Sequence, residues 1–177
     1  MKFAATNPPR LLLVEPHKGA LAVTAKRLAE AGYRVIACDS PANAVAELHR
    51  VPVDLVIAEA RMKPISGIEL TRLVRDDGGL RDLPVILIAG RSDATGAIEG
   101  FDAGADDVVA KPFDFDVLKA RVDRRLRRAR AERALRADNA TLDARVIERA
   151  IALGETRAAL EASEVERKRL ERMVARG

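Results

Sequence analysis

A short apolar run that ends in an acid constrains the fold more than any other part of this sequence. Residues 55–58 read Leu-Val-Ile-Ala, Glu59 follows them, and a loop with Pro64 and Gly67 leads into a helical pattern. An uninterrupted apolar run bounded by turn residues is typical of a parallel strand that is buried on both faces. Because ligands and chemistry gather at the carboxyl ends of such strands, we expect Glu59 to lie at the functional edge of a sheet.

The rest of the first two thirds of the chain repeats this pattern of a strand followed by a helix. The predicted strands are residues 10–15, 33–38, 53–58, 83–88 and 108–110, and helices are predicted at 17–31, from 41, at 67–76, from 92 and from about 116. Gly96 and Gly100 are expected to weaken the fourth helix. Right-handed crossovers then give an α/β fold, a doubly wound five-stranded parallel sheet in the flavodoxin-like order 2-1-3-4-5. This order places Glu15 near Glu59.

Composition excludes several classes of protein. The single cysteine, Cys38, rules out an intramolecular disulfide and a zinc site built from cysteines, and we expect it to be buried at a strand end. No run approaches the roughly 20 apolar residues of a membrane helix, and the N-terminus lacks a signal-peptide pattern, so a cytoplasmic protein is expected. Aromatic residues make up 3% of the chain, which is too few for the stacking platforms of proteins that bind single-stranded nucleic acid.

The sequence changes character after Phe113. Residues 1–113 hold 14 Lys/Arg and 15 Asp/Glu, whereas residues 114–177 hold 17 and 12, so the excess positive charge lies in the tail. One helix over about 116–175 would be roughly 90 Å long. A heptad register places Asn139, Val146, Leu153, Leu160, Arg167 and Val174 at a, and Leu135, Leu142, Arg149, Thr156, Ser163 and Leu170 at d. A charged helix of this length needs a partner helix.

Three regions are therefore predicted: a flexible N-terminus at 1–9, a folded domain at 10–128, and an extended helix at 129–177 that forms a coiled coil. Our hypothesis is a homodimer through this helix, first of all a parallel one, although the heptad pattern alone does not fix the orientation. Asn139 would be the polar a residue that sets the register.

Several segments resemble the receiver domain of two-component response regulators. The resemblance covers about residues 9–128 and rests on Leu11–Pro16, Asp54–Met62, Gly67, Leu83–Gly90 and Gly104–Phe113. The Gly-Ala-Asp-Asp sequence that Lys-Pro-Phe follows four residues later is a specific signal of this family. The resemblance implies a CheY-like fold, a role in a phosphorelay, and a histidine kinase as partner.

The resemblance also implies a role for each residue at the carboxyl edge of the sheet. In this family an aspartate that ends the third strand accepts the phosphoryl group, and two acids after the first strand hold Mg²⁺. A Thr or Ser on the fourth strand and an aromatic residue on the fifth respond to phosphorylation, and a lysine contacts the phosphate. The equivalent positions here are Glu59 (acceptor), Glu15 and Pro16 (acid pair), and Ala89, Val108 and Lys111 (switch).

Of these positions, only Lys111 and one acid of the pair, Glu15, keep the residue type of the family. Glu59 is longer than an aspartate by one carbon–carbon bond, about 1.5 Å, and a misplacement of about 1 Å can lower a rate about a hundredfold. With Pro16 in place of a ligand, Glu15 offers at most a degenerate Mg²⁺ site, and no other cofactor is expected. We therefore predict a pseudo-receiver. Glu59 is interpreted either as a stand-in for phosphoaspartate that reaches Lys111, or as a structural ion pair with Lys111.

Other polar residues receive simpler interpretations. His17 and His49 are interpreted as solvated side chains, and Asp106 and Asp107 as part of the turn into the fifth strand. No catalytic constellation is present, so an enzyme is not expected. The stretch Lys119–Arg136 has nine Lys/Arg and could bind the phosphates of a nucleic acid through counterion release, but a solvated helix face explains it more simply.

Three functional hypotheses follow. The first is a degenerate receiver that works through protein–protein interaction and coiled-coil dimerisation, without ordinary aspartyl phosphorylation. The second is a phosphorylatable switch whose tail leads to an output domain outside this chain. The third is a regulator that binds nucleic acid through the basic helix.

Overall fold

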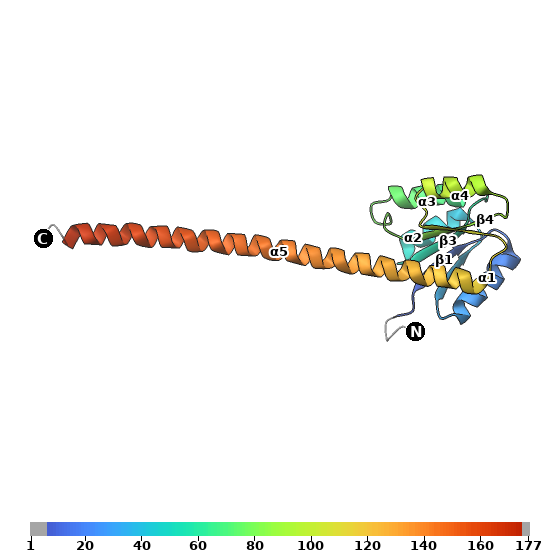
Figure 1. Cartoon of the computed structure of the whole chain (residues 1–177), viewed down its shortest axis with the longest axis horizontal. Helices are drawn as coiled ribbons and strands as arrows, with labels where there is room; N and C mark the ends of the chain where they lie inside the picture. Colours follow the sequence, from blue (N-terminus) through green and yellow to red (C-terminus); the bar gives the residue numbers. More distant parts are fainter. Residues whose placement is uncertain (1–6, 175–177) are drawn as a thin grey trace. The chain divides into compact units, whose positions relative to one another are not determined.

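The computed structural model describes residues 7–174, which form one parallel sheet and five helices (Figure 1). The strands are β1 (Arg10–Val14), β2 (Arg34–Cys38), β3 (Leu55–Glu59), β4 (Val85–Ala89) and β5 (Asp107–Ala110). The helices are α1 (Lys18–Glu30), α2 (Pro41–Arg50), α3 (Gly67–Asp76), α4 (Ala94–Asp102) and α5 (Phe115–Val174). The strand order β2-β1-β3-β4-β5 and the parallel pairing confirm the predicted fold. Residues 1–6 of the predicted flexible N-terminus lie outside the described residues.

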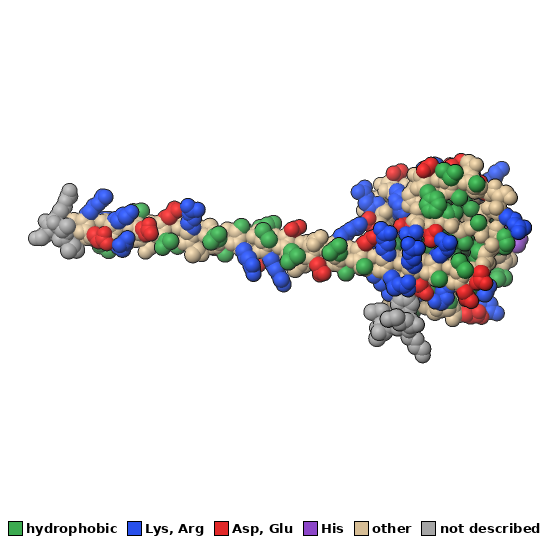
Figure 2. Space-filling model, in the orientation of Figure 1, with side chains coloured by type: hydrophobic (Ala, Val, Ile, Leu, Met, Phe, Trp, Pro, Cys, Tyr) green, Lys and Arg blue, Asp and Glu red, His purple; other side chains and the backbone are tan. Residues whose placement is uncertain are grey.

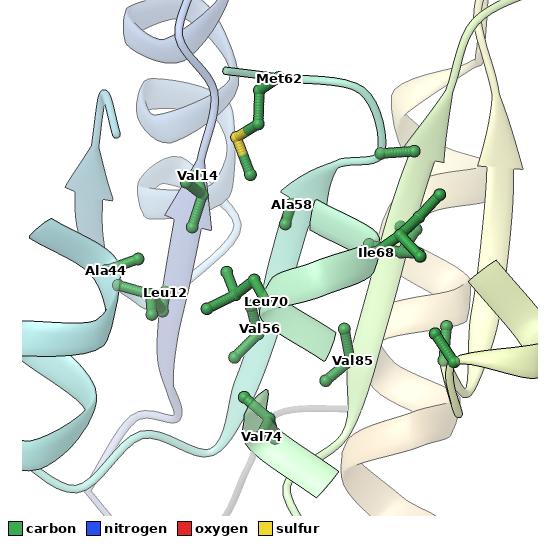
Figure 3. Packing of buried hydrophobic residues seen from close by; sticks show 14 of the residues in the cluster. Leu12, Val14, Ala44, Val56, Ala58, Met62, Ile68, Leu70, Val74 and Val85 are labelled. Atoms are coloured by element: carbon green, nitrogen blue, oxygen red, sulfur yellow. The ribbon is translucent and has the colours of Figure 1, made fainter. Parts of the chain in front are cut away.

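Alternate residues of the central strands supply two separate cores, one on each face of the sheet. On one face, Leu12 and Val56 pack with α2 and α3, whose buried side chains include Leu70 (Figure 3). On the other face, Leu11 and Leu55 pack with α1 and the first turns of α5. This alternation follows from the period of two along a strand and explains why residues 11–14 of β1, residues 55–58 of β3 and the whole of β4 are apolar.

The structure explains why α4 contains two glycines, Gly96 and Gly100, although both lower its helix propensity. A Cβ atom on Gly100 would lie 2.8 Å from Cδ1 of Leu87, so only glycine allows α4 to approach β4 this closely. A Cβ atom on Gly96 would collide with the carboxylate of Asp93, which caps α4 by accepting a hydrogen bond from the Gly96 N–H at 2.7 Å. Gly100 therefore allows close packing and Gly96 allows capping, and each lowers the intrinsic stability of the helix.

The chain divides into two units, residues 1–130 and 131–177, and α5 contributes to both. In the first unit, Leu118, Val122 and Leu126 of α5 are buried against the sheet. In the second unit, every described side chain from 131 to 173 is exposed. The helix continues without interruption through Gly154. None of the helices within residues 7–174 combines the length and hydropathy that a membrane span requires.

Candidate functional site

The carboxyl ends of three strands bring three charged residues together, as the sequence predicts. Glu59 is the last residue of β3, Glu15 follows β1, and Lys111 follows β5. Backbone hydrogen bonds between neighbouring strands extend to two of these residues. The N–H of Glu15 donates to the carbonyl oxygen of Cys38, and the N–H of Lys111 donates to that of Ala89. The start of α3 packs closely against the end of β3 at Gly67, the first residue of α3. A Cβ atom on Gly67 would collide with the carbonyl oxygen of Glu59.

Lys111 is shared between the two carboxylates. Its Nζ lies 2.5 Å from Oε2 of Glu59 and 3.1 Å from Oε2 of Glu15. Only the contact with Glu15 has the geometry of a hydrogen bond, so the contact with Glu59 is an ion pair. The side chains of Glu15 and Glu59 are 9% and 13% exposed, whereas that of Lys111 is 39% exposed. The site therefore holds two buried negative charges against one half-buried positive charge.

This imbalance appears in the pKa values of the cluster. Burial raises the pKa of Glu59, and the nearby Glu15 raises it further, while Lys111 lowers it without cancelling the effect. Burial lowers the pKa of Lys111, but its hydrogen bond to Glu15 and its attraction to both carboxylates outweigh burial and raise this pKa overall. Lys111 thus stays charged, and Glu59 holds its proton more tightly than an ordinary glutamate.

The two remaining switch positions carry no polar group. Ala89, at the end of β4, is 2% exposed and belongs to the core that α2 and α3 cover. Val108 packs against the same core and lies 3.5 Å from where a Cβ atom on Gly100 would be. A methyl group and an isopropyl group offer no hydroxyl or ring that could follow a change of charge at Glu59.

The side chains at the ends of β1 and β3 do not offer the oxygen ligands that the Mg²⁺ ion of this family would need. Mg²⁺ requires several oxygen ligands in octahedral geometry. Both carboxylate oxygens of Glu15 are already occupied, since Oε1 accepts from the His17 N–H at 2.9 Å and Oε2 accepts from Lys111. The next residue, Pro16, offers no side-chain ligand. Among residues 7–174, no three His, Cys, Asp or Glu side chains converge as a metal site would need.

An arginine beside the site forms contacts that the sequence did not reveal. Arg61, two residues after Glu59, donates from Nε to Oδ2 of Asp93 at 3.0 Å, and its Nη1 lies 3.0 Å from Oε2 of Glu99. These contacts tie the loop after β3 to the start and the middle of α4. Arg61 holds the pKa of Asp93 below its usual range. No local pattern signals such a pairing, because the partners are more than 30 residues apart in the chain.

His17, Asp106 and Asp107 have structural roles, whereas His49 has an exposed side chain. His17 caps α1 by accepting a hydrogen bond at Nδ1 from the Ala20 N–H at 3.1 Å, and His49 lies exposed in the last turn of α2. Asp106 lies in the turn, as predicted, and accepts from Arg75 at 2.8 Å. The prediction for Asp107 was wrong, because this residue is the first of β5 and is 6% exposed.

The basic stretch of α5 is partly engaged with the folded unit. Nη1 of Arg121 lies 2.8 Å from Asp107, and Nη2 of Arg125 lies 3.8 Å from the same carboxylate. Lys119 pairs with Asp123 at 2.7 Å, and this aspartate also accepts a hydrogen bond from the hydroxyl of the buried Tyr33. Burial and the carboxylate of Asp123 raise the pKa of that hydroxyl well above its usual range. The pairs with Asp107 fasten α5 to β5, and the hydrogen bond from Tyr33 to Asp123 fastens α5 to the residue before β2.

The doubly wound sheet, with acids at the ends of β1 and β3 and a lysine at the end of β5, defines a CheY-like signalling domain. Residues 11–123 match the family described as the response regulator receiver domain. This chain belongs to that family, whose members are modules of two-component signal transduction that typically interact with histidine kinases.

Three similar proteins illustrate the match. The transcriptional regulatory protein AfsQ1 of Streptomyces coelicolor is 32% identical over 141 residues, which is 80% of this chain and 60% of that protein. The regulatory protein VanRB of Enterococcus faecalis is 36% identical over 122 residues, which is 69% of this chain and 54% of that protein. The signal receiver domain of a histidine kinase from Syntrophus aciditrophicus is 30% identical with a TM-score of 0.63, covering 67% of this chain and 89% of that structure. This chain thus spans little more than half the length of the first two.

Proposed function

We propose that this chain is an atypical receiver, a pseudo-receiver that signals through protein–protein interaction and not through ordinary aspartyl phosphorylation. The observation that carries this proposal is the position of Lys111 between Glu15 and Glu59. The lysine that would contact a phosphoryl group in this family is already neutralised by two carboxylates. Glu59 therefore acts as half of a structural ion pair.

Three further features support the same conclusion. The Mg²⁺ that phosphoryl transfer uses to neutralise charge has no adequate set of ligands, because Pro16 replaces one acid and Lys111 occupies the other. A longer acceptor misplaces the attacking oxygen. Finally, Ala89 and Val108 leave no side chain to transmit a change of charge, so a permanent carboxylate at Glu59 would not be sensed as a phosphoryl group.

The second part of the proposal is a homodimer formed by the tail, residues 129–177. The a and d residues of the heptad register would form the seam of the coiled coil, and four apolar ones among them are exposed: Leu142 at 55%, Val146 at 66%, Leu153 at 71% and Leu160 at 59%. Figure 2 shows apolar side chains at intervals along this helix, between charged ones. A helix with an unpaired apolar seam gains stability when a second helix covers that seam.

The test is the molar mass in solution by light scattering, with and without Mg²⁺ and beryllofluoride, which mimics a phosphoryl group. We expect a dimer of the same mass under both conditions. A monomer that dimerises only with the mimic would overturn the proposal and favour the phosphorylatable switch.

Nucleic-acid binding is the less favoured alternative. Arg121 and Arg125 of the basic stretch form ion pairs with Asp107 of β5, and Lys119 forms one with Asp123 of α5 itself. Fewer cations are then available to release counterions from a phosphate backbone. Binding of duplex DNA that weakens steeply with salt would favour this alternative, and absence of binding at low salt would exclude it.

A further inference from the structure

The tail is one uninterrupted helix, so its heptad register can be followed from Leu135 to Leu170 without a shift. The seam residues Leu135 and Leu170 are 61% and 53% exposed, like the four seam residues between them that are named above. The register also places charged residues at two positions inside the seam, Arg149 at d and Arg167 at a. These two arginines restrict the orientation in which two copies of the tail can pair.

A parallel pair would bring like charges together. In a parallel coiled coil, each a or d residue faces its own copy, so Arg149 would face Arg149 and Arg167 would face Arg167. At the edges of the seam, g residues face e residues of the next heptad. The pairs formed there would be Asp138 with Asp143 and Glu166 with Glu171, both of like charge. No g–e pair within residues 138–171 would join opposite charges.

An antiparallel pair removes these conflicts, because an a residue then faces a d residue of the other copy and e residues face e residues. We infer that two tails pair antiparallel, with Leu142 of each copy facing Leu160 of the other. This inference rests on the homodimer proposed above. In this register Arg149 faces the apolar Leu153, so no two arginines meet in the seam.

The edges of the seam support the same register. Asp143 would face Arg157 of the second copy, and Arg136 would face Glu164, and both pairs occur twice because of the twofold symmetry. Arg157 is free to make this exchange, since its ion pair with Glu161 of its own helix is exposed, at 80% and 68% for the two side chains.

This antiparallel register also has an unfavourable contact. Asp138 would face Glu166 at the other edge of the seam. The parallel arrangement has two kinds of like-charge contact at its edges, two arginine layers in its seam and no compensating attraction. Charge complementarity therefore favours the antiparallel pair, in which each tail begins where the other ends.

Cysteine cross-linking of the full chain tests this inference. Cys38 is the only cysteine and is 4% exposed, so a Cys38→Ala background leaves no thiol except the introduced one. Leu142→Cys and Leu160→Cys proteins are oxidised separately and after mixing and re-equilibration, and the products are identified by mass spectrometry. We expect a disulfide between positions 142 and 160 in the mixture, and little cross-linking in either protein alone.

The other outcomes contradict the inference in distinguishable ways. Efficient cross-linking of each protein with itself would show a parallel pair. Dimers by light scattering that form no 142–160 disulfide would exclude this register, while the proposed homodimer would stand. Monomers by light scattering would overturn the homodimer itself.

A distance measurement gives an independent readout. Ala137→Cys carries a spin label on the exposed face of the helix, in the same Cys38→Ala background. At a rise of 1.5 Å per residue, two such labels would be about 42 Å apart along the axis of the antiparallel pair. Two labels with no separation along the helix axis, as in a parallel pair, would overturn the inference.

Discussion

Glu15 and Glu59 lie at the carboxyl ends of different strands but share one cation, since Nζ of Lys111 lies 3.1 Å and 2.5 Å from their carboxylates. The fold creates this proximity, because the order β2-β1-β3-β4-β5 places the ends of β1 and β3 side by side. One positive charge therefore faces two negative charges whose carboxylates are largely closed to water. The stability of the folded unit should therefore depend on Lys111 more than on either acid.

Replacing Lys111 by methionine tests this dependence. Lys111→Met leaves Glu15 and Glu59 facing each other without a cation, so we expect the free energy of unfolding to fall by about 1–3 kcal/mol. Loss of one partner of a fully buried pair costs about 3–5 kcal/mol, and the smaller value applies because the lysine side chain is 39% exposed. Urea unfolding gives the measurement. Lys26→Met is the control, because Lys26 forms only an exposed pair with Glu30, and an equal loss in both variants would contradict the account.

The raised pKa of Glu59 predicts a pH dependence of stability. The folded chain binds the proton of Glu59 more tightly than the unfolded chain, in which the pKa is about 4.3. The stabilisation from this proton is complete below that value and is lost as pH rises through the folded pKa. Glu59→Gln removes the titration, so wild type should lose stability relative to this variant between pH 4 and neutrality. A gain of wild type over Glu59→Gln across the same range would show that Lys111 outweighs burial.

The two glycines Gly154 and Gly100 should respond to alanine in opposite directions. A Cβ atom on Gly154 would have no atom within 4 Å, so Gly154→Ala should stabilise the tail helix by about 1 kcal/mol through helix propensity alone. Gly100→Ala forces a Cβ atom to 2.8 Å from Leu87 and should destabilise the folded unit by about 1–3 kcal/mol. Thermal unfolding followed by circular dichroism measures both. Stabilisation by Gly100→Ala would show that α4 can move away from β4 at little cost.

The position of the seam can be tested with two glutamate substitutions, one in the seam and one on the opposite face of the tail helix. Leu160 lies in the seam and Ile151 on the opposite face, and both are 59% exposed. Leu160→Glu should convert the dimer to a monomer in light scattering, because it buries a carboxylate against Leu142 of the other copy, whereas Ile151→Glu should leave the mass unchanged. Loss of the dimer in the Ile151→Glu protein alone would move the interface to the other face.

Local patterns in the sequence predicted the sheet well, because they report burial directly. The apolar runs at β1, β3 and β4 and the turn residues between them led to the correct topology, and the topology led to the proximity of Glu15 and Glu59, which share Lys111. Gly100 shows the limit of this approach. Helix propensity alone predicts a weak helix there, and only the position of Leu87 reveals why glycine is required.

Side-chain pairs that join distant segments could not be predicted in this way. Arg61 with Asp93 and Asp107 with Arg121 depend on how loops and helix starts are oriented, which no periodicity reports. The sequence pattern predicts a turn at both Asp106 and Asp107, whereas Asp107 is the first residue of β5. The ion pairs with α5 make its burial in β5 tolerable.

The most direct test of the central claim is the mass of the intact chain after incubation with acetyl phosphate and Mg²⁺, with a phosphorylatable receiver treated in parallel. The account predicts that the control gains one phosphoryl group and that this chain gains none. A labile phosphoryl group on this chain, mapped to Glu59, would contradict the account and establish a working switch despite Pro16, Ala89 and Val108.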